Sequence, residues 1–554
     1  MLKIKNEGKK LKVRGTWDWL KIFISGCEHK LLIGIVLLGI ILRFCGLNWG
    51  YPFIFQPDED TLVRGAIGIR FDPNPHHFDW PTLQTYLLFF VISIWAKFTD
   101  FLALLGLKPL VNNLFPIWFD RPFVFYLWGR IISALAGGGS LILTYLISKK
   151  IFNKKTAFLA VFLLAISLQN IEDSHFATLD SSMTFWMLLA FYFAQRIYEK
   201  GILKYYILAG FVSGLAASTK YNGGAIFLVV VVYHILLAAK EKFSVKETLF
   251  SKKLGFSILF AVFGFLLGTP YAVLDFRTFI RFDSPKGALW QFSRQSGISF
   301  FKRYGNLLLL ENTFRKYSFL SLGVYTSLLS VWGLASCAIF KYKKGLAGIL
   351  SFTLFYLWYV GQFPQFLSQY FNPLYPFLVI FAAFGFFEVL GLLGRKRREI
   401  FILISLIFFG LSLWHAVKLV FVFSTKDTRL QARDYIYKNA PAGTWIALAG
   451  ADKMEIEEYN NEDNTGYNLR SLSFLIDAIG RHESERFVIS ALKEEYKIGY
   501  VVVGDYGLDY VLAHPYDPGF ENYSSAQWTV QNLEEVMRFK PRFYNEPWVI
   551  VYKL

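Results

Sequence analysis

The sequence predicts a polytopic α-helical membrane protein with a small α/β domain at its C-terminus. Three observations lead to this fold class. Of the 554 residues, 54% are hydrophobic, and the mean hydropathy is +0.38, which exceeds what a soluble protein can bury. Apolar runs of about spanning length recur along residues 1–424. Residues 425–554 contain no such run and are rich in Asp, Glu, Asn, Tyr and Gly.

About eleven apolar runs are suited to cross a bilayer as helices. They lie near Leu31–Trp49, Phe123–Ile147, Ala157–Ile171, Ser182–Ile197, Tyr205–Ala217, Ala225–Ala239, Leu254–Val273, Phe319–Phe340, Leu346–Gly361, Phe371–Leu393 and Ile400–Phe423. The first run follows a basic N-terminus and is too long for an ordinary cleaved signal peptide, so we expect it to be retained.

Charge sets the expected orientation. The basic clusters lie at Lys149–Lys155, Lys240–Lys246, Lys341–Lys344 and Arg395–Arg398, and such loops face the cytoplasm. Basic loops that face anionic lipid therefore account for the net charge of +17, and binding to nucleic acid is not needed to explain it. We expect an integral protein of the plasma (inner) membrane, with a cytoplasmic N-terminus and the C-terminal domain on the extracytoplasmic side.

One apolar stretch breaks this alternation. If Thr85–Leu107 crossed the membrane, Lys149–Lys155 would face outward, and the stretch also contains Lys97 and Asp100. We therefore expect a helix that lies in or dips into the outer interface, within one external loop of residues 52–122. The alternative is a true span with a second crossing near Val111–Phe119.

The C-terminal segment, residues 425–554, has the length and pattern of a small external α/β domain. Strands are expected at Trp445–Ala449, Tyr500–Val503 and Val549–Tyr552, and helices at Arg429–Lys438 and Glu483–Lys497. The three cysteines form no metal-ligand spacing and no disulfide framework.

The expected external loops collect charged side chains that the spans lack. Candidate site residues are Asp58, Glu59 and Arg64 after the first span, Asp173, His175 and Asp180 after the third, Lys220 and Tyr221 at a later turn, and Arg130 near the outer end of a span. A carboxylate can take a proton from an acceptor, and fixed cations stabilise an anionic leaving group. The constellation indicates group transfer from a lipid phosphate at the membrane surface.

Each of these residues also has a structural interpretation. Asp58-Glu59 and Asp180 could cap helix N-termini, where acidic side chains are favourable. Arg130 could pair with a buried carboxylate. Lys220 could extend its ammonium to the outer interface.

The order of several short motifs resembles that of the GT-C membrane glycosyltransferases of family 39, which use phospholipid carriers and include protein O-mannosyltransferases and aminoarabinose transferases. The motifs are Gln56-Pro57-Asp58-Glu59, Asn74-Pro75 with Trp80-Pro81 and Tyr86-Leu87, Arg130-Ile131-Ile132-Ser133-Ala134, Ser174-His175-Phe176-Ala177-Thr178-Leu179-Asp180, Ser218-Thr219-Lys220-Tyr221-Asn222-Gly223 and Gln369-Tyr370-Phe371-Asn372-Pro373-Leu374-Tyr375-Pro376. The resemblance covers most of the membrane part and is weakest after residue 424.

The resemblance implies a GT-C fold and an inverting sugar transfer from a polyprenyl-phosphate donor to a protein, lipid or glycan acceptor. It implies that Asp58 is the catalytic base and Glu59 its partner, that Asp180 is a second acid, and that Lys220 and Arg130 hold the carrier phosphate. It implies no metal and no cofactor. Many relatives have Arg where this chain has Gln369, so Lys302 or Arg303 is an alternative phosphate ligand.

Two other classes remain open from the sequence. A lipid or solute transporter (a flippase) would also place an Arg inside a span, although its charges would gather at the bilayer midplane. A non-catalytic scaffold would leave the clustered acids and cations unexplained.

Overall fold

The computed structural model describes residues 16–107, 123–290, 318–340, 344–360, 368–449, 465–472, 475, 485–504, 533–540 and 549–554. The alternative phosphate ligands Lys302 and Arg303 lie outside these ranges. The chain divides into two compact units. The membrane unit comprises Met1–Phe44, Asp58–Ile117 and Val124–Val417, and the C-terminal unit comprises Cys45–Pro57, Trp118–Phe123 and Lys418–Leu554.

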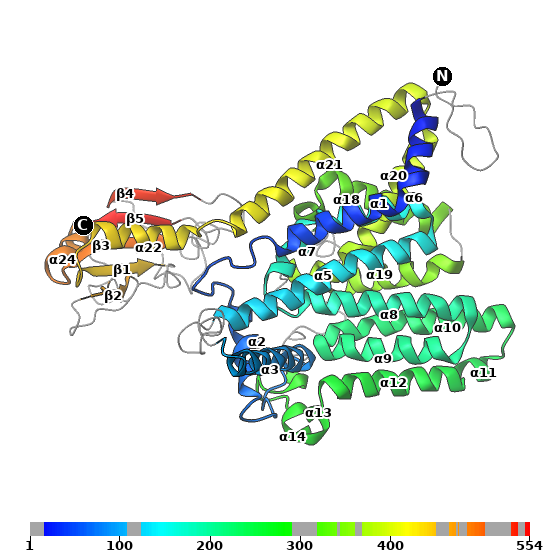
Figure 1. Cartoon of the computed structure of the whole chain (residues 1–554), viewed down its shortest axis with the longest axis horizontal. Coiled ribbons are helices and arrows are strands. Elements are labelled where there is room, and N and C mark those ends of the chain that lie inside the picture. The colour runs from blue at the N-terminus through cyan, green and yellow to red at the C-terminus, as the bar shows by residue number, and fades with distance from the viewer. Residues whose placement is uncertain are drawn as a thin grey trace. The chain divides into compact units, whose positions relative to one another are not determined.

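The membrane unit is a bundle of helices (Figure 1). The helices are α1 (Thr16–Phe44), α2 (Pro57–Gly68), α3 (Leu83–Leu104), α5 (Phe123–Ile151), α6 (Lys154–Ala165), α7 (Leu168–His175), α8 (Asp180–Lys200), α9 (Leu203–Thr219), η1 (Tyr221–Ile226), α10 (Phe227–Glu241), α11 (Val245–Leu249), α12 (Lys252–Gly268), α13 (Tyr271–Leu274), α14 (Phe276–Phe279), α18 (Val324–Ala335), η2 (Ser336–Phe340), η3 (Lys344–Leu346), α19 (Ala347–Val360), η4 (Ser368–Leu374), α20 (Tyr375–Leu392) and α21 (Arg395–Phe423). Each expected apolar run coincides with one or two of them, which confirms the polytopic helical class.

Fewer helices than the eleven expected satisfy a strict test of length and apolarity. Among the described residues, 6 stretches are long and apolar enough to cross a membrane, or up to 7 if the bent pair α6–α7 is one span. Two further apolar helices, Val324–Ile339 and Ala347–Val360, are shorter than that test requires.

Close packing of α9 against α12 depends on small residues. A Cβ added at Gly214 would lie 2.0 Å from the carbonyl oxygen of Ala261, and one at Gly264 would lie 2.3 Å from that of Phe211. Glycine therefore lets the two backbones approach each other, as in many helix pairs inside membranes, where packing rather than the hydrophobic effect drives association.

The run expected as one span, Ala157–Ile171, is bent by 55° between α6 and α7. The guanidinium of Arg43 is buried at this bend, where it donates to the carbonyl oxygens of Leu164 (3.0 Å) and Ala165 (3.2 Å) and to Oδ1 of Asn170 (2.5 Å). Arg43 thus adds hydrogen bonds to carbonyl groups of the last turn of α6, where the regular helical pattern ends. The bend turns α7 and its polar side chains away from the axis of α6.

The helix expected at the interface is α3, which is continuous and mostly exposed, with Gln84 and Leu88 buried. Figure 1 shows α3 almost end-on, whereas α8, α9 and α12 run in the plane of the view. The axis of α3 therefore runs across those of the bundle, which is the orientation that a helix lying along the membrane surface would have.

The C-terminal unit is built on a five-stranded sheet of order β2-β1-β3-β5-β4. Its strands are β1 (Trp445–Ala449), β2 (Asn468–Ser471), β3 (Ile498–Gly504), β4 (Glu534–Phe539) and β5 (Val549–Lys553). β1 pairs in parallel with β2 and β3, whereas β5 is antiparallel to β3 and β4.

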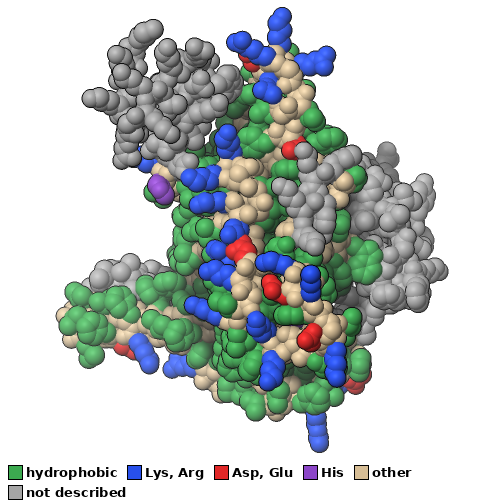
Figure 2. Space-filling model, turned by 90° about the vertical axis from the view of Figure 1, so that its right-hand side faces the viewer, with side chains coloured by type: hydrophobic (Ala, Val, Ile, Leu, Met, Phe, Trp, Pro, Cys, Tyr) green, Lys and Arg blue, Asp and Glu red, His purple; other side chains and the backbone are tan. Residues whose placement is uncertain are grey.

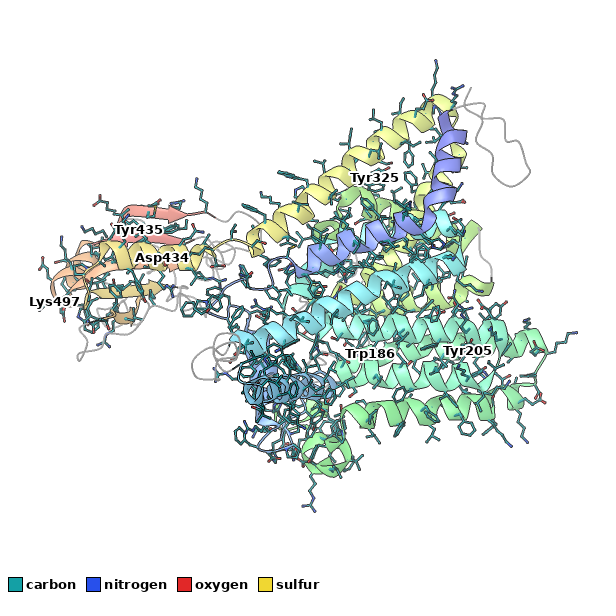
Figure 3. All side chains as sticks on the ribbon, in the orientation of Figure 1. Trp186, Tyr205, Tyr325, Asp434, Tyr435 and Lys497 are labelled. Carbon is teal, nitrogen blue, oxygen red and sulfur yellow. The ribbon has the colours of Figure 1, made fainter. Side chains whose placement is uncertain are left out.

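Two helices, α22 (Thr428–Asn439) and α24 (Glu485–Glu494), pack on this sheet through separate apolar clusters. Val502 joins the cluster with α22, and its neighbour Val501 joins the cluster with α24, because successive strand residues point to opposite faces. Tyr435 of α22 packs on Phe539 of β4 at 6.3 Å between ring centroids (Figure 3). The sequence missed β2 and β4, which are short or rich in charged residues.

The segment Cys45–Pro57, which leads into α2, belongs to this second unit. The guanidinium of Arg429 pairs with Asp427 (2.8 Å) and lies 3.7 Å from the ring centroid of Phe55. Arg433 lies 4.6 Å from the ring centroid of Phe53. The start of α22 therefore holds the chain immediately before Pro57.

Candidate functional site

The N-terminus of α2 presents three acidic residues, Asp58, Glu59 and Asp60, in its first turn. Acids are stabilised there by the unpaired backbone amides and the helix dipole. Their side chains nevertheless have three different surroundings: Asp58 is half-buried, Glu59 is fully buried and Asp60 is half-buried beside Arg64. A shared role as a cap would not separate them in this way.

Asp58 receives one hydrogen bond from the late motif of the membrane unit. The side-chain amide of Gln369, in η4, donates to Oδ2 of Asp58 at 3.2 Å. No ion pair to Asp58 occurs within the described part of the chain. The carboxylate therefore keeps acceptor capacity for a hydroxyl group of a substrate.

Glu59 and Arg130 form a buried ion pair between α2 and α5. Nε and Nη2 of Arg130 donate to the two carboxylate oxygens of Glu59, each at 2.7 Å, and the backbone N–H of Ala177 donates to Oε1 at 2.8 Å. The side chains are 1% and 0% exposed. These contacts correspond to the structural interpretation of Arg130, and they favour it over the expected contact with a carrier phosphate.

Asp180 and Lys220 form the second buried pair, at the start of α8 and the end of α9. The ammonium of Lys220 donates to Oδ1 of Asp180 at 2.8 Å and lies 4.7 Å from the ring centroid of Tyr370. Asp180 is the first residue of α8, after the N-cap residue Leu179, and the side chains of Lys220 and Asp180 are 16% and 2% exposed. Burial lowers the pKa of Lys220, but the Asp180 carboxylate outweighs it, so the pKa is raised.

Asp173 and His175 lie at the end of α7, near the second pair. Oδ1 of Asp173 accepts from the side-chain amide of Gln169 at 2.8 Å, while its buried Oδ2 makes no hydrogen bond within the described residues. Nδ1 of His175 lies 2.8 Å from the carbonyl oxygen of Ile171, one turn back in the same helix. One oxygen of the Asp173 carboxylate can thus still accept a hydrogen bond. The carboxylate also interacts electrostatically with Asp180 and Lys220.

Arg64 lies apart from this cluster. Its guanidinium is on the surface, 2.7 Å from Oδ1 of Asp60, which also accepts from the hydroxyl of Tyr126 at 2.6 Å. Burial alone would raise the pKa of Asp60, but these two hydrogen bonds outweigh it and lower the pKa. The contacts give Arg64 a partner on its own helix and do not favour the expected role in substrate binding.

Tyr221 contacts the loop between α2 and α3. Its hydroxyl donates to the carbonyl oxygen of Phe78 at 2.8 Å. Tyr221, which was expected to bind substrate, thus anchors the loop that follows α2.

Two residues of η4 connect the proposed base to the buried cation. Gln369 contacts Asp58, and the next residue, Tyr370, contacts Lys220. A carboxylate and an ammonium therefore stand on either side of one short helix. The sequence marked Gln369 only as a departure from a motif that also contains Tyr370, and it gave no signal for Gln169. Within the described residues, no three His, Cys, Asp or Glu side chains are grouped so that they could hold a metal ion.

Comparison with known proteins gives a family for part of the chain. Residues 101–284 match the family model described as dolichyl-phosphate-mannose-protein mannosyltransferase. The match covers about a third of the 554 residues. The matched region includes Arg130, Asp173, Asp180 and Lys220 but not Asp58.

A curated relative is the putative mannosyltransferase YkcB of Bacillus subtilis (strain 168). It is 30% identical over 136 residues, which are 24% of this chain and 19% of that protein. The match thus spans about a fifth of the length of the relative.

Two solved structures are also similar to this chain. The oligosaccharyltransferase AglB of Archaeoglobus fulgidus, in complex with an inhibitory peptide and a dolichol-phosphate, has a TM-score of 0.48 and 14% identity, with 94% of this chain and 74% of that chain covered. ArnT from Cupriavidus metallidurans, bound to undecaprenyl phosphate, has a TM-score of 0.41 and 11% identity, with coverage of 97% and 98%.

Proposed function

We propose that this protein is a membrane glycosyltransferase that moves a sugar from a polyprenyl-phosphate donor to an acceptor at the extracytoplasmic membrane surface. One observation carries the proposal. A half-buried carboxylate, Asp58, and a partly buried ammonium, Lys220, contact the adjacent residues Gln369 and Tyr370, respectively. A base and a cation so placed suit a transfer in which a proton is taken up while a phosphate departs. The family matched by residues 101–284 is described by a lipid-phosphate donor, which supports the same class of substrate.

The reaction needs one proton transfer and one displacement. A hydroxyl oxygen of the acceptor attacks the anomeric carbon while Oδ1 or Oδ2 of Asp58 takes the hydroxyl proton. The bond between the anomeric carbon and the phosphate oxygen breaks, and its electron pair leaves with the polyprenyl phosphate. Attack opposite the leaving group inverts the anomeric centre.

Lys220 is proposed to stabilise the departing phosphate. An ammonium has three N–H donors, and Asp180 accepts one of them, so donors remain for the phosphate oxygens. The site is buried, which strengthens such a contact relative to water. The free Oδ2 of Asp173 is proposed to accept a hydroxyl of the donor sugar.

Arg130 and Glu59 are proposed to act through position rather than by contact with substrate. The bidentate ion pair between Arg130 and Glu59 fixes the first turn of α2 against α5. Because Asp58 precedes Glu59 directly, this pair sets where the proposed base stands. Neither Arg130 nor Arg64 is assigned to the phosphate.

The placement of charge supports an extracytoplasmic site. Asp180 begins α8 and Lys200 ends it. The 21 residues of this helix, at about 1.5 Å each, span roughly 30 Å, the thickness of a bilayer core. Figure 2 shows Lys and Arg side chains gathered on the face at the far ends of these helices. Exposed lysines on that side include Lys149, Lys240 and Lys246. Since basic ends face the cytoplasm, the acidic end would face outward.

A donor panel tests the proposal. The full chain in nanodiscs would be incubated with polyprenyl-phosphate hexoses and pentoses, and released polyprenyl phosphate would be measured by mass spectrometry. Release from at least one donor, with the sugar recovered on water or on an acceptor, is expected. A folded protein that neither releases nor binds any of these lipids would contradict the proposal.

A further inference from the structure

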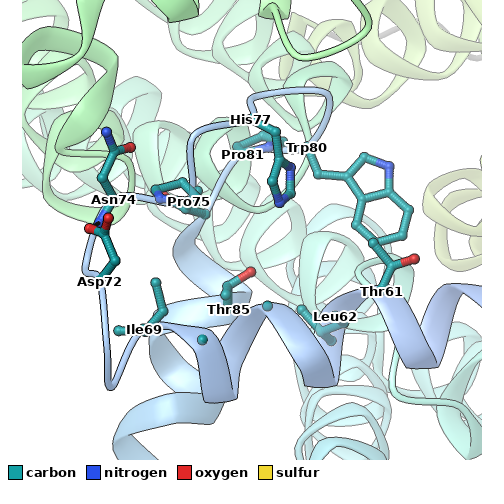
Figure 4. A pocket seen from close by; sticks show the side chains of 13 residues that line it. Thr61, Leu62, Ile69, Asp72, Asn74, Pro75, His77, Trp80, Pro81 and Thr85 are labelled. Atoms are coloured by element: carbon teal, nitrogen blue, oxygen red, sulfur yellow. Dashed lines mark hydrogen bonds between the residues drawn. The ribbon is translucent and has the colours of Figure 1, made fainter.

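A cavity of about 220 Å³ lies between α2, the loop after it and the first turn of α3 (Figure 4). His77 and Trp80 extend from the loop toward Thr61 and Thr85 on the helices. The volume is below the roughly 300 Å³ at which pockets for drug-sized ligands begin. It therefore suits a single small ring rather than a chain of rings.

The cavity continues the face of α2 on which Asp58 stands. Its lining includes Thr61, Leu62, Gly65 and Ile69, which follow Asp58 by 3, 4, 7 and 11 positions. Residues at such spacings share one helical face, and one turn rises about 5.4 Å. The end of the cavity at Thr61 is thus about one helical turn from Asp58, whereas Asp58 contacts Gln369 and Lys220 contacts the next residue, Tyr370.

The lining is polar but lacks cations. None of the described side chains that line the cavity is Lys or Arg, so an anionic phosphate finds no countercharge there. Hydroxyl, amide and imidazole groups of Thr61, Thr85, Asn74 and His77 can exchange hydrogen bonds with hydroxyls. Trp80 adds an aromatic surface suited to the C–H face of a sugar ring.

The loop wall is held in place before any ligand binds. The backbone N–H of Phe78 donates to the carbonyl oxygen of Lys286 at 2.6 Å, and its own carbonyl accepts from Tyr221. The amide of Asn74 donates to Asp275 at 3.0 Å. Nδ1 of His77 lies 2.7 Å from Oδ1 of Asp79, which fixes the imidazole and leaves Nε2 for a ligand.

We propose that this cavity is the acceptor subsite and that it holds one sugar residue of a glycan acceptor, with a hydroxyl directed toward Asp58. The inference rests on the proposed transfer reaction and adds the class of the acceptor. The lining has no Lys or Arg and includes the carboxylate of Asp72, so it disfavours an anionic ligand. Together with the size and the aromatic wall, this favours a hydroxylated ring without negative charge.

A cavity-filling substitution tests the inference. A Cβ added at Gly65 would meet Cγ2 of Thr85 at 3.6 Å, an ordinary contact, and one at Gly68 would meet nothing within 4 Å. A side chain at position 65 can therefore begin without a clash at Cβ, and Gly65→Leu adds bulk to the wall of the cavity; Gly68→Leu is a second such variant. Gly255→Leu is the matched control, since Gly255 in α12 also has nothing within 4 Å and does not line the cavity.

Binding is measured without donor, by saturation-transfer NMR on the full chain in nanodiscs. The probes are methyl hexopyranosides and a peptide containing Ser and Thr. We expect glycoside binding by the wild type and Gly255→Leu, and binding weakened by about tenfold or more in folded Gly65→Leu. Equal binding by Gly65→Leu, no glycoside binding at all, or loss of only the peptide signal would overturn the inference.

Activity separates this inference from the proposed function. With a donor that the wild type uses, Gly65→Leu should raise the KM for a glycan acceptor while donor binding is retained. Glycosides that bind the cavity in a protein that turns over no donor would contradict the transfer reaction and leave the class of cavity ligand standing.

Discussion

The buried pair of Glu59 and Arg130 gives a prediction whose size follows from its geometry. Arg130→Met would leave the Glu59 carboxylate buried with the N–H of Ala177 as its remaining donor described above, and Glu59→Gln would remove the negative charge that accepts both hydrogen bonds from the guanidinium. Both side chains are almost fully inaccessible to water, so solvent cannot replace the lost partner. Breaking such a pair costs about 3–5 kcal/mol.

The expected effect can be converted to a melting temperature. For domains of 150–250 residues, 1 kcal/mol shifts Tm by about 2–4 °C, and larger units shift less. At about 1–2 °C per kcal/mol, each single variant should therefore lower Tm by roughly 3–10 °C. The double variant Glu59→Gln/Arg130→Met holds no lone charge and should lose less than either single variant.

Thermal unfolding in nanodiscs, together with donor binding, checks this reasoning. Donor binding should follow folding, so it should return in the double variant. If both single variants melted like the wild type, the pair would not hold α2 as described. If donor affinity were lost in Arg130→Met and equally in the double variant, Arg130 would contact the phosphate, contrary to its assigned role.

Three further predictions concern the second pair. Lys220→Met should slow release of polyprenyl phosphate by about 10²–10³, because the developing anion loses one hydrogen-bond donor. Lys220→Arg should restore part of this rate, measured by single-turnover mass spectrometry. An unchanged rate in Lys220→Met would show that Lys220 takes no part in the reaction. The pKa of Lys220 is raised above 10.5 in the folded protein. The stabilisation from its pair with Asp180 is therefore complete below pH 10.5 and is lost as the pH rises through the folded pKa. Measured against pH, the Tm of the wild type should fall at alkaline pH, the Tm of Lys220→Met should lack this fall, and this group should change Tm little near neutrality. Chelation by EDTA should leave the rate unchanged, because Lys220 is the countercharge assigned to the phosphate; a loss that Mg²⁺ or Mn²⁺ restored would contradict that assignment.

Local patterns predicted the helices and supplied the candidate site residues. Apolar runs gave the bundle because spanning helices need about 20 apolar residues in sequence. Asp58, Asp180 and Lys220 were identified because charges beside such runs are costly. The strand at Trp445–Ala449 was predicted to the residue because an apolar run of strand length marks it.

The partners of these residues could not be read from the sequence. Glu59 meets Arg130 across 71 positions, and Gln369 meets Asp58 across 311, so neither spacing carries a local signal. No Pro or Gly marks the bend in Ala157–Ile171. Its hydrogen-bonding partner is Arg43, which donates to the carbonyl oxygen of Leu164 from 121 positions away. Strand β4 reads as a polar segment since it is an exposed edge.

The most direct test of the account compares Asp58→Asn with the wild type, using a donor that the wild type turns over. Asparagine keeps the shape and the contact with Gln369 but cannot take up a proton. We predict that donor binding and Tm are retained while release of polyprenyl phosphate falls by about 10²–10⁴ or more. Release near the wild-type rate from folded Asp58→Asn would show that Asp58 is not the base and would contradict the central claim.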